Sequence, residues 1–355
     1  MSAGNRILVT GGGGFIGGWI VDALYMQGRT EVRAGIRSWT GASRIARLPV
    51  EIVLCNVLDR AQIAKAMEGV GTVVHCAVGS AAATVEGTGN ILEASARAGV
   101  RRFVHLSTVD VYGDALGDVD ESVPFKRTGS EYGDTKIDAE ELCWSYHSKG
   151  LPVVVLRPSA VYGPYNKLWV AKFAERILSG RWGTFGRLGD GNCNLVYVTD
   201  LLQAIFLAMN SDRAVGQAFN VNGTDAITWN DYFTKFNAAL GGAPLPAVPP
   251  GKFRAGSVVM TPLKAGARFV MGHFSAPVTA LYQRSPMVRR LMKMTEARMK
   301  TTPGGEEIAM FARKTRYTVG KAGDLLGFRP AVDVDRGLSM SVRWLAHESQ
   351  IFRKT

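Results

Sequence analysis

The stretch ILVTGGGGFIGGWIVDAL, residues 7–24, places four consecutive glycines between an apolar, strand-like segment and an apolar, helix-like one. The continuous apolar residues before Gly11 predict a buried strand, and the segment after Gly14 has helical periodicity. A tight turn between a strand and a helix leaves backbone amides at the helix N-terminus, where they bind phosphate groups. We therefore interpret the glycines as a phosphate cradle and not as a flexible turn.

The first half of the chain alternates apolar, β-rich runs with helical patterns. Residues 19–28 and 88–99 have helical periodicity, and each segment ends in a glycine that suits a helix C-terminus. Apolar strands that alternate with helices are typical of a parallel sheet covered on both faces. The sequence therefore predicts an α/β fold with a doubly wound parallel sheet, whose strands lie at 7–10, 31–36, 50–55, 72–77, 102–107 and 152–157.

The pattern loosens in the second half of the chain. Residues 194–209 predict a short strand that enters a buried helix, and residues 217–223 predict one more strand. We therefore expect a sheet domain over residues 1–165, to which 194–223 returns, and a smaller, mainly helical domain over residues 166–355.

The net charge of +12 is concentrated in one segment. Residues 251–316 contain thirteen Lys and Arg against three Glu, which argues against a general nucleic-acid binder and for a local surface that faces anions. Within this segment, residues 286–300 project as a cationic amphipathic helix with methionines on its apolar face. Such a helix predicts contact with an anionic membrane surface or a lid over an apolar ligand, although a solvated helix explains the pattern equally well.

The four cysteines are too widely spaced for a metal site, and no disulfide framework is expected. The chain passes from Met1 to an apolar strand within five residues, which leaves no space for a signal peptide. We therefore expect a cytoplasmic protein without a metal, and membrane association at the cytoplasmic face stays open.

The end of the second predicted strand bears on the identity of a dinucleotide bound at the glycines. An acidic residue at this place would hold a ribose hydroxyl, whereas an arginine favours a 2′-phosphate. The sequence EVRAGIRS, residues 31–38, has no acid at its end and offers Arg37 and Ser38. We therefore expect NADP in preference to NAD, although a solvated Arg37 would give the same pattern.

Tyr132 and Lys136 lie in the helical pattern SEYGDTKIDAEEL, and their spacing of four places both on one helix face. A lysine ammonium beside a phenol lowers the pKa of the phenol, as a general acid/base for an alcohol/ketone pair requires. Ser107 and Thr108 stand at the end of the fifth strand, where either hydroxyl could hold the substrate oxygen. These residues predict hydride transfer with Tyr132 as the general acid/base.

These residues resemble the extended short-chain dehydrogenase/reductases, also called the NAD-dependent epimerase/dehydratase family. By this resemblance the fold is Rossmann-like, and residues 166–355 form a substrate domain. Among the two possible registers of the glycine motif, one starting at Gly11 and one at Gly12, the resemblance selects the first, with Gly12 and Gly13 as spacers. Further matching segments are HCA (75–77), EGTGNILEA (86–94), STVDVYG (107–113), RPSAVYGP (157–164), LVYVTDLLQAI (195–205) and KAGDLLGFRPAVDVDRGL (321–338).

The resemblance implies roles for individual residues. Thr108 matches the catalytic hydroxyl better than its neighbour Ser107, beside the catalytic pair Tyr132 and Lys136. The implied cofactor contacts are Gly11, Gly14, Phe15, Ile16, Gly17, Arg37, Ser38, Asn56, Val57, Ala77, Tyr132, Lys136, Pro158 and Ser159.

Departures from the family narrow the expected function. Val109 and Asp110 stand where dehydratases usually carry an Asp-Glu pair, so dehydration is not expected. Ala160 and Cys193 stand where nucleotide-sugar epimerases often have an asparagine and an arginine near the nucleotide. Thr84 replaces an asparagine that is common in the family.

The basic, methionine-rich segment is similar to insertions in family members that resemble 3β-hydroxysteroid dehydrogenases. The sequence therefore favours an NAD(P)-dependent oxidoreductase that interconverts a secondary alcohol and a ketone on a bulky, lipid-like substrate. The alternatives are a nucleotide-sugar epimerase of the UDP-hexose type and a non-catalytic dinucleotide-binding subunit, although the latter class commonly loses the Tyr/Lys pair. The expected partners are a small-molecule substrate and an anionic membrane, with a homodimer left open and no nucleic acid.

Overall fold

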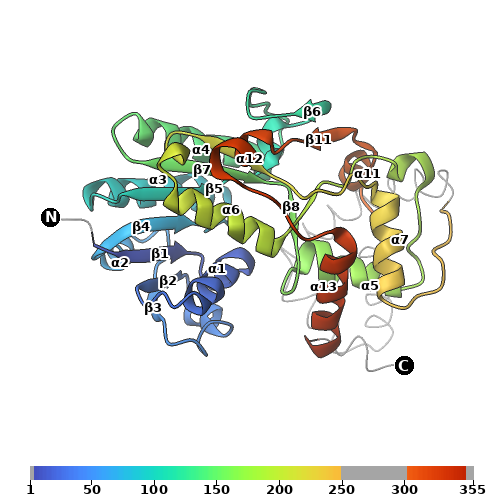
Figure 1. The fold of residues 1–355 in the computed structure, drawn as a ribbon, viewed down its shortest axis with the longest axis horizontal. Coiled ribbons are helices and arrows are strands. Elements are labelled where there is room, and N and C mark those ends of the chain that lie inside the picture. Colours follow the sequence, from blue (N-terminus) through green and yellow to red (C-terminus); the bar gives the residue numbers. More distant parts are fainter. Residues whose placement is uncertain (1–3, 249–301, 349–355) are drawn as a thin grey trace, which may run out of the picture. The chain divides into compact units, whose positions relative to one another are not determined.

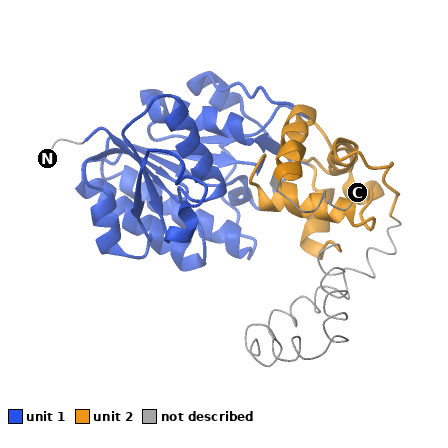
Figure 2. Ribbon diagram, turned by 90° about the horizontal axis from the view of Figure 1, so that it is seen from below, with its two compact units in different colours: residues 1–162, 194–225, 315–333 blue, residues 163–193, 226–314, 334–355 orange. Residues whose placement is uncertain are grey.

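The structure is a computed structural model in which residues 4–248 and 302–348 are described. The chain divides into two compact units, which Figure 2 shows in different colours. Unit 1 comprises residues 1–162, 194–225 and 315–333, and unit 2 comprises residues 163–193, 226–314 and 334–355.

Unit 1 contains a seven-stranded sheet of parallel strands in the order β10-β7-β5-β4-β1-β2-β3 (Figure 1). Every residue of β2, β5, β7 and β10 is buried, as expected for strands covered on both faces. The strands are β1 (Arg6–Thr10), β2 (Val32–Ile36), β3 (Glu51–Leu54), β4 (Val70–His75), β5 (Arg102–Leu106), β7 (Val153–Pro158) and β10 (Ala218–Val221).

The helices of unit 1 form two groups (Figure 1). In one group α3 packs against α2 and α4, and in the other α6 packs against α1 and α12. This arrangement confirms the predicted α/β, doubly wound architecture. The bounds are α1 (Phe15–Met26), α2 (Arg60–Ala66), α3 (Ala81–Arg97), α4 (Glu131–His147), α6 (Val198–Asn210) and α12 (Gly320–Leu326).

Two short parallel pairs complete unit 1. Strand β6 (Gly117–Val119) pairs with β11 (Thr315–Tyr317), and β8 (Ala160–Tyr162) pairs with β9 (Leu195–Tyr197). The β6–β11 pair places residues 315–333 in unit 1, whereas the sequence assigned them to the second domain. The difference arises because this strand pairs across about two hundred residues of sequence, which periodicity does not reveal.

Unit 2 is mainly helical and has an aromatic core. Trp182, Phe233 and Phe311 are almost fully buried, and the Trp182 and Phe233 rings meet edge to face at 5.3 Å. Its described elements are the π-helical turn η3 (Lys167–Ala171), α5 (Lys172–Leu178), the 3-10 turn η4 (Gly186–Gly189), α7 (Trp229–Ala239), α11 (Gly305–Ala312) and α13 (Val334–Glu348).

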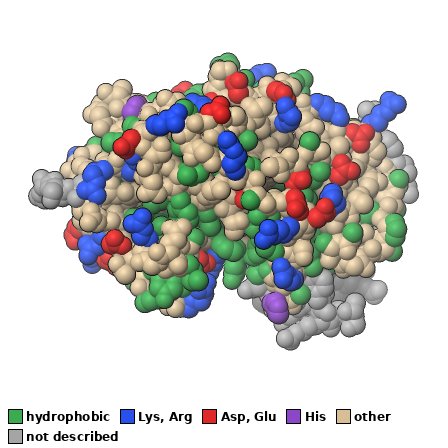
Figure 3. Space-filling view, in the orientation of Figure 1, with side chains coloured by type: hydrophobic (Ala, Val, Ile, Leu, Met, Phe, Trp, Pro, Cys, Tyr) green, Lys and Arg blue, Asp and Glu red, His purple; other side chains and the backbone are tan. Residues whose placement is uncertain are grey.

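The predicted amphipathic helix at 286–300 lies outside the described residues, as does most of the basic segment 251–316. On the face drawn in Figure 3, Lys and Arg side chains are interspersed with Asp and Glu and do not gather in one patch. Over residues 4–248 and 302–348, no helix combines the length and the apolar character needed to cross a membrane.

Candidate active site

The glycine loop joins β1 to α1 through a conformation that side chains would obstruct. Gly11 adopts a φ of 68°, which favours glycine. A Cβ atom at Gly17 would lie 2.2 Å from the Gly11 carbonyl oxygen, and one at Gly14 would lie 3.1 Å from the same atom. No side chain caps α1, so the amides of its first turn, which includes Phe15 and Ile16, have no acceptor within the helix. The loop therefore fits a dinucleotide pyrophosphate at this helix N-terminus.

Gly12 and Gly13 are packing positions as well as spacers. A Cβ atom at Gly13 would lie 2.1 Å from the Gly41 carbonyl oxygen, and one at Gly12 would lie 3.1 Å from Ala34 Cβ. The Gly12 amide also donates to the Gly35 carbonyl at 2.9 Å. The loop is therefore held against β2 and the segment that follows it.

The segment after β2 presents the residues expected to choose between NADP and NAD. Arg37 and Ser38 are exposed, and the Ser38 hydroxyl lies 2.8 Å from that of Thr40. In contrast, Arg44 is tied to Asp22 by a contact of 2.8 Å. Arg37 and Ser38 thus stand at the carboxyl end of β2, in reach of solvent.

The other predicted cofactor contacts follow β3, β4 and β7. Ala77 lies against the glycine loop, because its Cα would be 3.1 Å from a Cβ atom at Gly11. The Asn56 side-chain oxygen accepts from the Leu58 amide at 3.3 Å, which shapes the turn after β3. The remaining three residues are Val57, whose carbonyl accepts from Asn90 at 3.0 Å, Pro158 at the end of β7, and the buried Ser159, whose hydroxyl donates to Asn222 at 2.8 Å.

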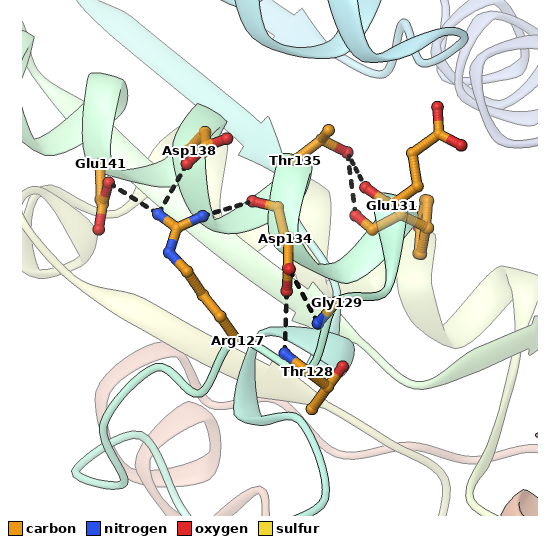
Figure 4. A network of polar contacts seen from close by, with 9 residues as sticks. Arg127, Thr128, Gly129, Glu131, Asp134, Thr135, Asp138 and Glu141 are labelled. Atoms are coloured by element: carbon orange, nitrogen blue, oxygen red, sulfur yellow. Dashed lines mark hydrogen bonds and ion pairs between the residues drawn. The ribbon is translucent and has the colours of Figure 1, made fainter.

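A polar network fixes the start of α4, the helix that carries Tyr132 (Figure 4). Arg127 contacts Asp138 at 2.7 Å and Glu141 at 3.3 Å, and it donates to the Asp134 carbonyl at 3.3 Å. The Asp134 carboxylate accepts from the backbone amides of residues 128–129 at 3.1 and 3.0 Å. The loop before α4 is therefore tied to the first three turns of the helix.

Lys136 is buried one turn beyond Tyr132. Its ammonium donates to the Leu106 carbonyl at the end of β5, at 2.7 Å. Burial lowers the pKa of Lys136 to about 8, while the neighbouring Cys76, Cys143 and Glu140 act in the opposite direction. The ammonium is thus anchored on the strand end that carries the predicted catalytic hydroxyl.

Tyr132 is 47% exposed, and its pKa differs from the expectation. The surrounding protein and the Asp110 carboxylate raise the pKa of Tyr132 to about 12, although a hydrogen bond with the Thr108 hydroxyl lowers it. The predicted lowering of this pKa is therefore wrong for this structure, because burial and the Asp110 carboxylate outweigh the interactions that lower it. The phenol is protonated at neutral pH.

The two candidate hydroxyls have different partners. Thr108 interacts with Tyr132, and its hydroxyl also lies 3.3 Å from an Asp110 carboxylate oxygen. The Ser107 hydroxyl is buried and donates to Glu140 at 2.8 Å. The structure thus brings Thr108 and Tyr132 together, whereas the Ser107 hydroxyl donates its hydrogen bond to the buried Glu140.

The sequence did not predict the buried polar residues behind this site. Glu140 is fully buried and forms an ion pair with Arg157 at 2.5 Å. Arg157 also donates to the Tyr112 hydroxyl at 2.7 Å. The sequence did contain a signal for Glu140. This residue lies four positions after Lys136 and therefore on the same helix face, where a buried acid needs a polar partner.

A pair of buried histidines lies on neighbouring strands of the sheet. The two His75 ring nitrogens lie 2.8 Å from the Thr10 hydroxyl and 3.1 Å from the Thr88 hydroxyl. The His105 ring stacks on His75 at 5.6 Å, and neither of its nitrogens has a hydrogen-bond partner. Burial, reinforced by the Lys136 charge, lowers the pKa of His75 to about 3 and that of His105 well below its usual value.

We expect these histidines to make unit 1 acid-sensitive. Since their folded pKa values lie below the unfolded value of about 6.5, the unfolded chain binds more protons, and stability falls as pH falls below about 6.5. We expect His105→Leu to raise stability by about 1–2 kcal/mol at neutral pH, because it removes two unpartnered polar atoms. Its loss of stability on acidification from about pH 6.5 to 5 should be shallower by up to about 1.4 kcal/mol per pH unit.

Urea titrations of wild type and His105→Leu at several pH values measure this difference. Equal slopes with pH for both proteins would show that His105 is not held neutral. His147→Leu serves as a matched control, since the His147 side chain lies at the last turn of α4 and is partly exposed.

A glycine cradle for a dinucleotide and a Tyr/Lys pair beside a strand-end hydroxyl define a nicotinamide-dependent enzyme of the extended short-chain dehydrogenase/reductase type. The chain belongs to the NAD dependent epimerase/dehydratase family, whose model matches residues 7–222, more than half of the chain. Among the described residues, no group of three or more His, Cys, Asp or Glu side chains could hold a metal ion.

Two relatives are named as a hydroxysteroid dehydrogenase and as a ketoreductase of a farnesyl compound. The chain is 28% identical over 253 residues to 3 beta-hydroxysteroid dehydrogenase/Delta 5-->4-isomerase of Mycobacterium tuberculosis, a match that covers 64% of this chain and 67% of the relative. It is 31% identical over 209 residues to 4-hydroxy-2-methyl-3-oxo-4-farnesyl-3,4-dihydroquinoline-1-oxide ketoreductase of Stigmatella aurantiaca, a match that covers 55% of this chain and 62% of the relative. The second match thus spans less than two thirds of that relative.

A solved structure shares the fold over the whole chain. UDP-glucuronic acid 4-epimerase from Bacillus cereus, in complex with NAD, aligns with a TM-score of 0.71 and 20% identity, covering 99% of both chains. At this identity the likeness shows the fold alone.

Proposed function

We propose that the protein is an NADP-dependent oxidoreductase that interconverts a ketone and a secondary alcohol on a bulky, lipid-like substrate. The observation that carries the proposal is the set formed by Tyr132, Thr108 and the buried Lys136 at the carboxyl end of β5. Its position in a sheet whose glycine loop fits a dinucleotide supports a reaction of this class.

The proposed chemistry follows from the protonation states of these groups. A bound nicotinamide ring would supply the hydride or take it up. The Tyr132 phenol, protonated at neutral pH, donates its proton to the ketone oxygen, and the reverse reaction returns it. The Thr108 hydroxyl holds the same oxygen, and the Lys136 ammonium stabilises the phenolate that forms.

The choice of a lipid-like substrate draws on the two relatives named above and on two positions of this chain. Ala160 and the buried Cys193 supply no charge to a diphosphate, and burial raises the pKa of the Cys193 thiol, so it is neutral. The fold shared with the Bacillus cereus epimerase keeps a nucleotide-sugar epimerase as the second candidate. A membrane contact, a homodimer and a cytoplasmic location stay predictions.

A turnover screen separates the two candidates. Purified protein is incubated either with NADPH and steroid or long-chain ketones, or with NAD⁺ and UDP-hexoses, and the change in nicotinamide absorbance and the products are measured. Stoichiometric NADPH oxidation with a lipidic ketone supports the proposal. Conversion of a UDP-hexose to its epimer without net cofactor consumption would replace it by the second candidate.

The proposed preference for NADP predicts a selective effect of Arg37→Ala. Removal of the guanidinium should weaken NADPH binding about tenfold or more, since a charge-assisted hydrogen bond contributes about 1.5–3 kcal/mol, while NADH binding changes little. Fluorescence titration gives both dissociation constants. Arg29→Ala is the matched control, because Arg29 is equally exposed but follows the far end of α1. A parallel change in both affinities, or none, would remove Arg37 from the specificity site.

A further inference from the structure

A buried ion pair contacts Ser107, the neighbour of the predicted catalytic residue Thr108. The Glu140 carboxylate is 0% exposed, and Arg157 binds it through Nε at 3.1 Å and Nη2 at 2.5 Å. The second carboxylate oxygen of Glu140 accepts from the Ser107 hydroxyl at 2.8 Å. One carboxylate thus connects α4, β7 and the end of β5.

Arg157 makes further contacts within unit 1. Arg157 donates from Nη1 to the Tyr112 hydroxyl at 2.7 Å, and this hydroxyl donates to the Asn220 side-chain oxygen at 2.7 Å. The Arg157 guanidinium also lies 5.1 Å from the centres of the Tyr112 and Phe125 rings. The arginine is therefore fixed in position and orientation.

Stability alone does not account for this arrangement. Desolvation of two charges consumes most of their attraction, so well-packed apolar side chains often do as well or better in such a place. The Glu140–Arg157 network instead adjoins the candidate active site at two places. Ser107 adjoins Thr108 directly after β5, and Glu140 lies one helical turn after Lys136 on α4.

Glu140 also differs in charge from the other groups that act on Lys136. These groups are His75 and Cys76 at the end of β4, His105 on β5, and Cys143 on α4. Burial keeps both histidines and both thiols uncharged at neutral pH. Among the described groups that act on Lys136, Glu140 is therefore the one that brings a negative charge.

We propose that Glu140 is a positioning residue for the proposed Tyr132 and Lys136 chemistry. Held by Arg157, its carboxylate fixes the Ser107 end of β5 against α4 and supplies the negative charge that favours the ammonium form of Lys136. This inference rests on the proposed function for its catalytic consequence, but the charge state of Lys136 is measurable without turnover.

The test removes the two charges together. Glu140→Gln alone leaves the buried Arg157 guanidinium without a counter-charge and can unfold the chain. The double variant Glu140→Leu/Arg157→Met instead replaces both charged side chains by apolar ones of similar volume. NMR of the protein labelled with ¹³C at lysine Cε reports the charge of Lys136 against pH, and Lys136→Met assigns its signal. We expect the titration midpoint in the double variant to fall by about one pH unit or more.

Glu140→Asp keeps the carboxylate and should keep the Lys136 midpoint close to that of wild type. An unchanged midpoint in the folded double variant overturns the proposal. If the wild type turns over none of the substrates tested, the proposed function fails, and the NMR titration still decides the role of Glu140.

Ser107→Ala tests the positioning part and buries no unpaired cation. We expect turnover to fall about tenfold or more with the KM for the cofactor unchanged, because Thr108 is misplaced. Ser107→Thr, which restores the hydroxyl, should recover most of the activity. Turnover equal to that of wild type in Ser107→Ala would contradict the role of this contact.

Discussion

Tyr132→Phe is expected to lower turnover by about a hundred- to ten-thousandfold, which is the usual contribution of a positioned general acid/base. The substitution removes the proton that the phenol donates and leaves the ring in place. Cofactor affinity should change far less than turnover, because the glycine loop and Arg37 are untouched and the Tyr132 ring stays in place. Steady-state kinetics and fluorescence titration of NADPH measure the two quantities.

The matched control for this variant is Tyr146→Phe, which removes a phenol from the same helix three turns or more further on. It should retain the turnover of wild type. Undiminished turnover in Tyr132→Phe would refute the assignment of the acid, whereas an equal loss in both variants would indicate damage to α4 as a whole.

Gly17→Ala is expected to reduce cofactor affinity by at least about tenfold and to destabilise unit 1 by about 1–3 kcal/mol. The added methyl would lie 2.2 Å from the Gly11 carbonyl oxygen, a backbone atom that cannot move without displacing the cradle. Each factor of ten corresponds to about 1.4 kcal/mol, so a small shift of the loop suffices.

The adjacent Gly18→Ala is a close control, because it adds the same methyl to the same helix. Its nearest neighbours would be Nη1 and Cδ of Arg44 at 3.1 and 3.2 Å, so a side chain that Asp22 holds must shift by a few tenths of an ångström, but no backbone atom of the loop is displaced. We expect affinity within about twofold of wild type and a smaller loss of stability than for Gly17→Ala, because better helix propensity offsets part of the crowding. Equal affinities for the two variants would mean that Gly17 does not shape the cradle.

The sequence predicted the main sheet well, for a physical reason that is visible in particular strands. Residues 152–156 form a continuous apolar run, residues 102–107 are rich in apolar side chains, and the strands β7 and β5 that they predict are buried at every position. The glycine loop was equally accessible to prediction, since its turn depends on residues that are adjacent in the sequence. The observed bounds of β5 and β7 differ from the predicted bounds by at most one residue at each end.

Long-range pairings could not be predicted from local patterns. Strand β11 joins β6, and Thr315–Tyr317 is too short for a periodic signal. The spacing from Lys136 marks Glu140 as buried, but its partner Arg157 could not be identified, because the two charges lie on different elements.

The protonation of the site was the least predictable property. The spacing of Tyr132 and Lys136 placed both on α4, but the pKa of Tyr132 depends on its burial and on its neighbours Asp110 and Thr108, which only the folded chain defines. The choice between Ser107 and Thr108 likewise needed Glu140, whose carboxylate accepts a hydrogen bond from the Ser107 hydroxyl.

Deuterium transfer tests the central claim most directly. The protein is incubated with NADPH that carries deuterium at the transferred position and with a lipidic ketone identified in the screen, and the alcohol product is analysed by mass spectrometry and NMR. We predict one deuterium at the new carbinol carbon, formed by wild type and largely lost in Tyr132→Phe. An alcohol without the label, or a label transferred equally well by Tyr132→Phe, would contradict the account.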